Sequence, residues 1–225
     1  MMQKVKQQMS ETMLCGSLLA LAGGFLDVYT YLARGHVFAN AQTGNIVLFG
    51  VSLARLDWLK AVQYLAPIAA FILGYLLTEA TKYRFLGSVR LHWRQATIVL
   101  ETAVLGLVAF LPAGDYDLVA NTAVSFVCSV QVQSFRKIHG NALATTMCTG
   151  NLRSGTEQLY TYWRTKERGA LKKGLEYYCI IFFFIIGAVL GAWMTNLFGQ
   201  YGVLFACLPL VIVFVLMFVR GPEGE

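Results

Sequence analysis

Six apolar stretches approach or reach the length of a membrane-spanning helix, and each carries at most two ionisable groups. A hydrocarbon core about 30 Å thick needs about 20 helical residues, because each residue adds about 1.5 Å. The sequence therefore predicts an all-α integral membrane protein. Its expected spans are residues 12–32, 62–80, 96–111, 118–135, 175–197 and 203–219.

The composition excludes an ordinary soluble enzyme. The chain is 57% hydrophobic and 13% charged, whereas soluble domains have about 45–50% apolar and about 25% charged residues. The net charge of +6 lies in short segments between apolar runs, which is typical of cytoplasmic loops and not of a nucleic-acid interface. The five cysteines form no C-x-x-C pair and the common enzyme motifs are absent, so we expect no metal, no cofactor and no catalysis.

Two further segments, 37–54 and 142–160, are apolar but begin with polar residues and glycine. Each could be a poor full span or a re-entrant half-helix. The first opens with Asn40, Gln42, Thr43, Gly44 and Asn45, and the second with Thr145, Thr146, Thr149, Gly150 and Asn151, followed by Arg153.

The two Thr-Gly-Asn motifs lie 106 residues apart, and other elements share this offset. It moves 12–32 onto 118–138 and 96–111 onto 202–217, where the fourth and sixth spans are expected. Three elements with one offset indicate an internal repeat. We therefore expect a single transmembrane domain with repeats at about 12–112 and 118–219.

The distribution of Lys and Arg favours one topology for the two difficult segments. If both segments cross, eight spans in parallel repeats place 10 basic residues inside and 7 outside. If both dip in and return, six spans place 14 inside, among them Lys4, Lys6 and Arg220, and 3 outside. The positive-inside rule favours the second arrangement. It puts both termini in the cytoplasm and inverts one repeat relative to the other.

Inverted repeats with broken helices are common in channels and secondary transporters, where the breaks lie near the midplane. In each Thr-Gly-Asn motif, glycine tolerates unusual backbone conformations, and threonine and asparagine can cap free N–H groups. The helix starts would then present positive dipole ends to a polar or anionic ligand. The alternative is that both motifs only cap packed half-helices.

Ionisable residues inside the spans are candidates for function, since a charge is costly at the bilayer centre. Asp27 lies in the first span, and its repeat counterpart is the neutral Gln133. Asp27 could carry a proton, pair with Arg153 or Arg34, or reach water at the helix end.

Glu101 and Arg153 each allow two interpretations. Glu101 lies six residues into the third span, where it could extend towards the basic loop or form a deep proton site. Arg153 follows the second motif by two residues, which suggests anion recognition or a salt bridge to Asp27.

Small residues recur at a spacing of four in both halves, as Ala70 with Gly74 and as Gly187 with Gly191. This spacing puts each pair on one helix face and lets neighbouring backbones approach closely. We expect internal helix packing, with formation of a homo-oligomer as the alternative.

Three segments together indicate a family. They are Gly-Phe-Leu-Asp at 24–27, Val-Phe-Ala-Asn-Ala-Gln-Thr-Gly-Asn at 37–45 and Thr-Thr-Met-Cys-Thr-Gly-Asn at 145–151. With these motifs the chain resembles, over nearly its whole length, the YoaK-like family of bacterial inner-membrane proteins. The resemblance implies a six-spanning membrane protein of uncharacterised function, and it brings no substrate or catalytic residues.

The leading hypothesis is a multi-pass plasma-membrane transporter or channel. It would move a small polar solute or ion through a site at the paired Thr-Gly-Asn breaks. The alternative is a non-transporting scaffold or regulatory subunit in the lipid bilayer. An intramembrane enzyme using Asp27 and Glu101 is disfavoured, because the sequence gives no geometry for acid–base work.

Overall fold

The computed structural model describes residues 11–84, 90–138 and 141–218. Lys4, Lys6, Arg220 and the predicted end of the last span at Val219 lie outside these residues. The described chain is built from helices, with one pair of two-residue antiparallel strands, β1 (Lys137–Ile138) and β2 (Asn141–Ala142). The α-helices are α1 (Met13–Ala33), α2 (Gln42–Ala54), α3 (Trp58–Arg84), α4 (Arg90–Ala109), α5 (Asp117–Ser134), α6 (Cys148–Thr165), α7 (Arg168–Phe198) and α8 (Cys207–Leu216).

The prediction of a helical membrane protein is confirmed. Within the described ranges, three helical stretches are long and apolar enough to cross a membrane: Met13–Ala33, Trp58–Lys82 and Arg168–Leu216. The last stretch contains two of the predicted spans, joined by a 3-10 helix, η2 (Gly199–Ala206). Gly199 ends α7 with a φ of 58°, a conformation that suits glycine. The last predicted span therefore begins as η2 and becomes α-helical only from Cys207.

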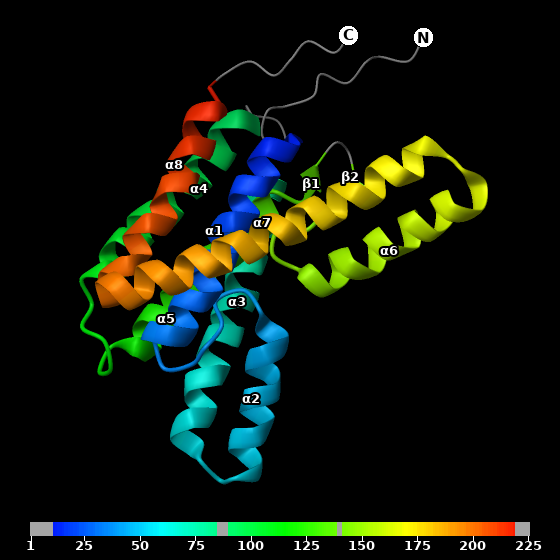
Figure 1. Cartoon of the computed structure of the whole chain (residues 1–225). Coiled ribbons are helices and arrows are strands. Elements are labelled where there is room, and N and C mark those ends of the chain that lie inside the picture. The colour runs from blue at the N-terminus through cyan, green and yellow to red at the C-terminus, as the bar shows by residue number, and fades with distance from the viewer. Residues whose placement is uncertain (1–10, 85–89, 139–140, 219–225) are drawn as a thin grey trace.

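Helix α1 lies at the centre of the molecule and packs along α7, while α5 packs along α3 (Figure 1). Glycines make both contacts close. A side-chain carbon at Gly187 of α7 would collide with the backbone of Leu21 in α1. One at Gly74 of α3 would lie 2.7 Å from the Phe126 carbonyl oxygen in α5. The small-residue faces predicted from the sequence therefore serve internal packing.

The main core fills the space between α1, α4, α5, η2 and α8. Its largest fully buried apolar side chains include Leu19, Leu26, Leu105 and Leu210. Burial of this surface holds the central helices together in the way apolar packing does in any core. The polar residues described below are exceptions inside this apolar packing.

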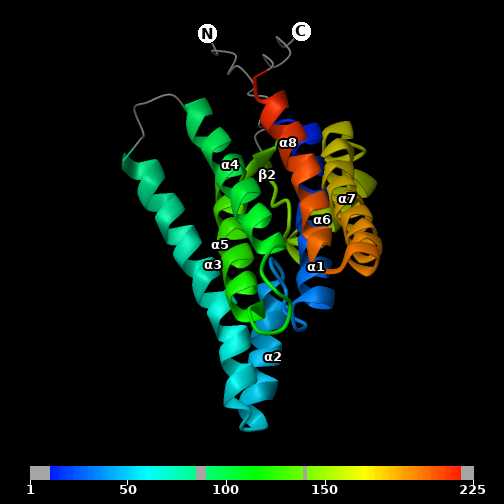
Figure 2. The ribbon, with the colours of Figure 1, turned by 90° about the vertical axis from the view of Figure 1, so that its left-hand side faces the viewer.

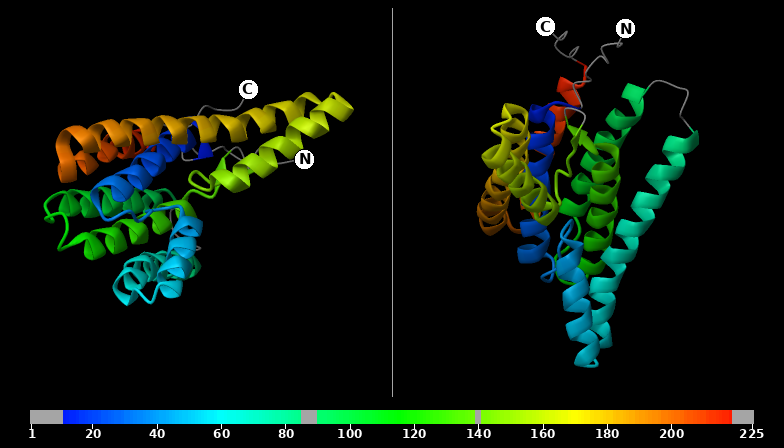
Figure 3. Two further views of the ribbon diagram at one scale, coloured as in Figure 1. Left: turned by 60° about the horizontal axis from the view of Figure 1, so that its bottom comes forward. Right: turned by 90° about the vertical axis from the view of Figure 1, so that its right-hand side faces the viewer.

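Two helical hairpins extend from the central bundle in different directions (Figure 1). The α2–α3 hairpin leaves it at the bottom of Figure 1, and the α6–α7 hairpin leaves it towards the upper right. Figure 2 and the right view of Figure 3 show the α2–α3 hairpin below the bundle, and the left view of Figure 3 shows the α6–α7 hairpin extending to one side. In each hairpin a shorter helix packs against a longer one, and each shorter helix begins beside the central bundle.

Candidate functional site

Asp27 fixes the loop that leads from α1 to α2. It lies on α1, six residues before the helix ends, and is 5% exposed. Its Oδ1 accepts hydrogen bonds from the backbone N–H groups of Asn40 at 2.6 Å and Ala41 at 3.3 Å. Ala41 is the N-cap residue of α2, so the carboxylate of one helix caps the start of another. A negative group in this position also complements the dipole of α2.

The first turn of α2 is tied back to the same loop. Asn45 is fully buried; its Nδ2 donates to the Phe38 carbonyl at 2.8 Å, and its Oδ1 accepts from the Phe38 N–H at 2.9 Å. Gln42 joins this arrangement, because its Oε1 accepts a bond from Asn45 and its Nε2 donates to the Ala39 carbonyl. Together these bonds close the loop over residues 38–45.

The start of α6 repeats one of these bonds. Asn151 is 3% exposed, and its Nδ2 donates to the Ala144 carbonyl at 2.6 Å. Asn45 reaches back seven residues to Phe38, and Asn151 reaches back seven residues to Ala144. The N-cap positions, Ala41 and Met147, are also 106 residues apart. The offset seen in the sequence therefore matches both the helix start and the bond behind it.

The expected role of the Thr-Gly-Asn residues as helix caps is wrong. Neither N-cap side chain makes a capping bond, and both threonines, Thr43 and Thr149, lie exposed inside the first turn. Gly44 and Gly150 are helical and do not have positive φ. The physical reason is that each helix begins before its Thr-Gly-Asn motif, so the motif lies inside the first turn. The buried asparagine then holds the preceding loop from within the helix.

Both loops meet on the same turn of α1. The Asn40 Nδ2 donates to the Gly23 carbonyl at 3.3 Å. Thr146, which lies 106 residues after Asn40, packs so closely against Gly23 that a side chain at residue 23 would collide with it. Cys148, the first residue of α6, lies within electrostatic reach of the Asp27 carboxylate. The structure thus brings together two segments that are about a hundred residues apart.

Glu101 is the most isolated polar side chain near this point. It is 0% exposed, and neither carboxylate oxygen has a hydrogen-bond partner among the described residues. This burial favours the deep-site interpretation of Glu101 over an extension towards the basic loop. The Cys128 thiol of α5 is also fully buried, and it lies within electrostatic reach of both Glu101 and Asp27. A buried carboxylate without a partner is costly in a membrane, which makes it a candidate for binding an ion or a proton.

The other predicted site residues lie elsewhere. Gln133 is 1% exposed on α5, and its backbone carbonyl accepts a bond from Lys82 of α3. Arg153 is exposed on α6. Within the described part of the chain no salt bridge joins it to Asp27, because Arg153 is exposed while Asp27 is buried. The exposed Thr43, Thr149, Gly150 and Arg153 are therefore separate from the buried Asp27 cluster.

Sequence reasoning missed the role of Arg34. This residue is 0% exposed, and its guanidinium donates to the Tyr29 hydroxyl at 2.9 Å and to the Val108 and Leu111 carbonyls at 2.9 and 3.0 Å. It also forms a salt bridge of 3.4 Å with Asp117. Arg34 thus ties the end of α1 to the α4–α5 connection. It is not a partner of Asp27, and nothing in the sequence indicated this pairing.

The fold and these buried polar groups define a helical membrane protein with two loops held inside its bundle. The family model described as "Protein of unknown function (DUF1275)" matches residues 15–216, so the chain belongs to this family. It is also similar to the UPF0700 transmembrane protein YoaK of Bacillus subtilis (strain 168). The two are 24% identical over 213 residues, which cover 89% of this chain and 90% of the relative. No solved structure matches the chain.

Proposed function

We propose that this protein is a multi-pass plasma-membrane transporter or channel for a small polar solute or ion. The observation that carries the proposal is the meeting of two loops, one from each half of the chain, at Gly23 and Asp27 of α1. Loops of this kind are tolerated within a bilayer only when protein or a water-filled cavity satisfies their backbone groups. Transporters place their ligand sites at such points.

Helix packing supports two inverted repeats. Helix α1 of the first half packs along α7 of the second half. Its counterpart in the second half, α5, packs in the same way along α3 of the first half. Helices α1 and α5 run in opposite directions (Figure 2). We therefore assign repeats at about 12–112 and 118–219, with α1, α3, α4, α5, α7 and η2–α8 as six spans and α2 and α6 as half-helices.

The charges of the two hairpins support a cytoplasmic location for both termini. The α6–α7 hairpin carries five basic residues between Arg164 and Lys173, whereas the tip of the α2–α3 hairpin carries Arg55 and Lys60 beside Asp57. The positive-inside rule places the α6–α7 end in the cytoplasm. Helix α7 has 31 residues and is about 46 Å long, so its first turns extend beyond a hydrocarbon core of about 30 Å.

In this proposal Asp27 couples the ligand to the loop ahead of α2. A cation or proton bound at Asp27 competes with the N–H groups of Asn40 and Ala41 for the same oxygen. Binding would therefore loosen this loop, while the start of α6 stays held by Asn151. Glu101, buried and unpartnered beside Cys128 among the described residues, is the second candidate for the ion pathway.

Cysteine accessibility tests whether water reaches the meeting point. In a background without the native cysteines, Ala39→Cys and Thr145→Cys each place one thiol in a loop where the native side chain is 1% exposed. Arg55→Cys and Arg164→Cys at the hairpin ends serve as exposed controls. We expect an impermeant maleimide to label Ala39→Cys from the side of Arg55→Cys, and Thr145→Cys from the side of Arg164→Cys.

Two outcomes contradict the proposal. If neither loop thiol reacts while both controls do, the loops are packed dry and the scaffold alternative is favoured. If Thr43→Cys and Arg55→Cys, at the two ends of α2, label from opposite sides, the chain has eight spans in parallel repeats.

A flux assay then tests transport itself. Proteoliposomes containing the protein are offered a panel of neutral solutes, organic anions and inorganic ions. We expect a flux that Asp27→Asn abolishes and that Lys60→Ala, a change at the far hairpin tip, leaves unchanged.

A further inference from the structure

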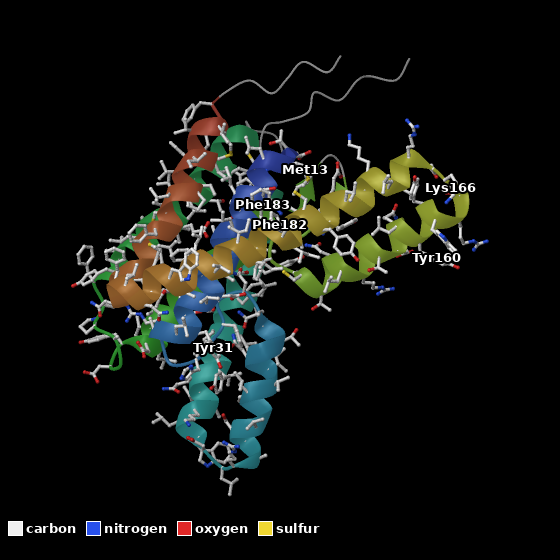
Figure 4. All side chains as sticks on the ribbon, in the orientation of Figure 1. Met13, Tyr31, Tyr160, Lys166, Phe182 and Phe183 are labelled. Carbon is white, nitrogen blue, oxygen red and sulfur yellow. The ribbon has the colours of Figure 1, made fainter. Side chains whose placement is uncertain are left out.

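A groove on the α6–α7 hairpin lies apart from the meeting point of the two loops. It has a volume of about 670 Å³ and is lined by Met13 of α1, Tyr162 of α6 and one face of α7. The α7 residues are Arg168, Leu171, Lys172, Leu175, Glu176 and Cys179. Figure 4 shows Met13 at the inner end of this region and Lys166 at the tip of the hairpin.

The groove changes from basic to apolar along α7. Arg168 and Lys172 are exposed at the end nearer the hairpin tip, and Leu175, 56% exposed, and Cys179 follow towards the bundle. Lys166 adds a third cation at the basic end, because its ammonium lies over the Tyr162 ring at 5.8 Å from the centroid. Glu176 is buried, so the exposed charges of the lining are positive.

We propose that this groove binds one anionic phospholipid of the surrounding bilayer. The phosphate would lie against Arg168 and Lys172, and an acyl chain would lie on Leu171, Leu175 and Met13. Basic pockets at the membrane surface bind anionic headgroups in this way. The proposal requires only that α7 enters the hydrocarbon near Leu175, and it does not depend on transport.

The spacing along α7 agrees with the dimensions of a lipid. Arg168 and Leu175 are seven residues apart, which is about 10 Å along a helix. The headgroup layer is about 5–8 Å thick on each side of the core. If Leu175 lies at the edge of the hydrocarbon, Lys172, three residues before it, lies within the headgroup layer. Arg168 begins just beyond this layer, and its long side chain can reach back to the phosphate.

The test is native mass spectrometry of the full chain in detergent, with phosphatidylglycerol and phosphatidylcholine of identical acyl chains. We expect wild type to retain phosphatidylglycerol preferentially. The double variant Arg168→Ala/Lys172→Ala should weaken this binding about tenfold or more, since each cation near a membrane surface contributes measurably to anionic-lipid binding. The matched control, Arg164→Ala/Lys173→Ala, removes two exposed charges from the same hairpin but outside the groove, and it should bind as wild type does.

Three further measurements distinguish a bound lipid from a site for free phosphate. Glycerol phosphate carries the anionic headgroup chemistry alone and should not displace the lipid. The exchange Arg168→Lys/Lys172→Arg keeps both positive charges and should bind phosphatidylglycerol as wild type does. If the groove variant does not fold, phosphatidylglycerol with a photoreactive acyl chain is cross-linked to wild type instead, and the adduct should fall on Met13, Leu175 or Cys179. The proposal would be overturned if the groove variant kept the preference for phosphatidylglycerol, or if the control variant lost as much lipid binding as the groove variant. Displacement of the lipid by glycerol phosphate, or cross-links outside the groove, would also overturn it.

Discussion

Helices α2 and α6 begin alike but differ on their outer faces. Each starts after an N-cap residue, Ala41 or Met147, whose own side chain makes no capping bond, and each uses a buried asparagine to hold the carbonyl seven residues earlier. Beyond this first turn α2 exposes Ile46, Val47 and Val51. Helix α6 exposes the charged Arg153, Glu157 and Arg164 beside the aromatic Tyr160 and Trp163. The shared part is therefore the attachment of the helix to the bundle, and the surroundings determine the rest.

The difference identifies what each helix faces in the proposed topology. Exposed apolar residues on α2 suit lipid, and the charged residues of α6 suit the water and headgroups at a membrane surface.

The starts of α2 and α6 also differ in how firmly the loop ahead of each helix is held. Asp27 supplies a carboxylate to the loop ahead of α2, while its counterpart Gln133 lies against α3 and Lys82. Among the described residues, the loop ahead of α2 is therefore held by more side-chain hydrogen bonds than the loop ahead of α6.

The largest expected effect comes from removing the carboxylate that distinguishes the two halves. Asp27→Ala leaves two buried N–H groups without their charged acceptor, and we expect a loss of about 3 kcal/mol or more in the free energy of unfolding. Gln133→Ala should cost about 1 kcal/mol or less, because the Nε2 of Gln133 has no partner among the described residues. Denaturation with SDS in bicelles measures both values.

Asp27→Asn is the control for this comparison. Its amide oxygen can still accept the two loop bonds, so it should recover most of the stability lost in Asp27→Ala while removing the charge. Equal losses in Asp27→Ala and Gln133→Ala would mean that the two loops are held equally well.

A smaller effect is expected from exchanging the outer faces. Val47 and Arg153 are repeat counterparts, and Val47 is 60% exposed. Arginine at the centre of a spanning helix costs about 2.5–3.5 kcal/mol, so Val47→Arg should destabilise the protein by about 2 kcal/mol if α2 faces lipid. Arg153→Val should change stability by about 0.5 kcal/mol or less, as exposed substitutions usually do. A neutral Val47→Arg in bicelles would place this face of α2 in water.

The sequence predicted where the helices lie but not what the polar side chains do. Runs of apolar residues determine helix positions locally, and the offset of 106 residues located the starts of both α2 and α6. The partners of Asp27 and Arg34 depend on the path of the chain after α1 turns back, which no local pattern encodes. Thr43 was expected to cap α2 because threonine often does so, but the N-cap lies two residues earlier. The convergence of both loops on Gly23 likewise depends on tertiary packing.

Alanine substitutions of Asn45 and Asn151 should differ by about a factor of two in the free energy of unfolding that they cost. Asn45→Ala removes bonds to both backbone groups of Phe38 and to Gln42, and we expect it to cost about 2–3 kcal/mol. Asn151→Ala removes the bond to the Ala144 carbonyl and should cost about 1–1.5 kcal/mol. Asn45→Asp, which keeps an acceptor for the Phe38 N–H, should be intermediate. A larger loss for Asn151→Ala in the same SDS titration would reverse the order of strength inferred for the two loops.

The smallest expected effect is a change in thermal midpoint on alanine substitution of Gly44 and Gly150, and its sign differs between the two. Both lie in the first turn of a helix, where alanine is favoured over glycine by about 0.5–1 kcal/mol. A side-chain carbon at Gly150 meets nothing within 4 Å, whereas one at Gly44 would lie 2.7 Å from the Phe38 ring. Gly150→Ala should therefore raise the thermal midpoint, and Gly44→Ala should lower it, because Phe38 is fixed through its backbone by Asn45. Parallel melting curves in one detergent decide this, and stabilisation by Gly44→Ala would mean that the loop ahead of α2 yields as readily as the loop ahead of α6.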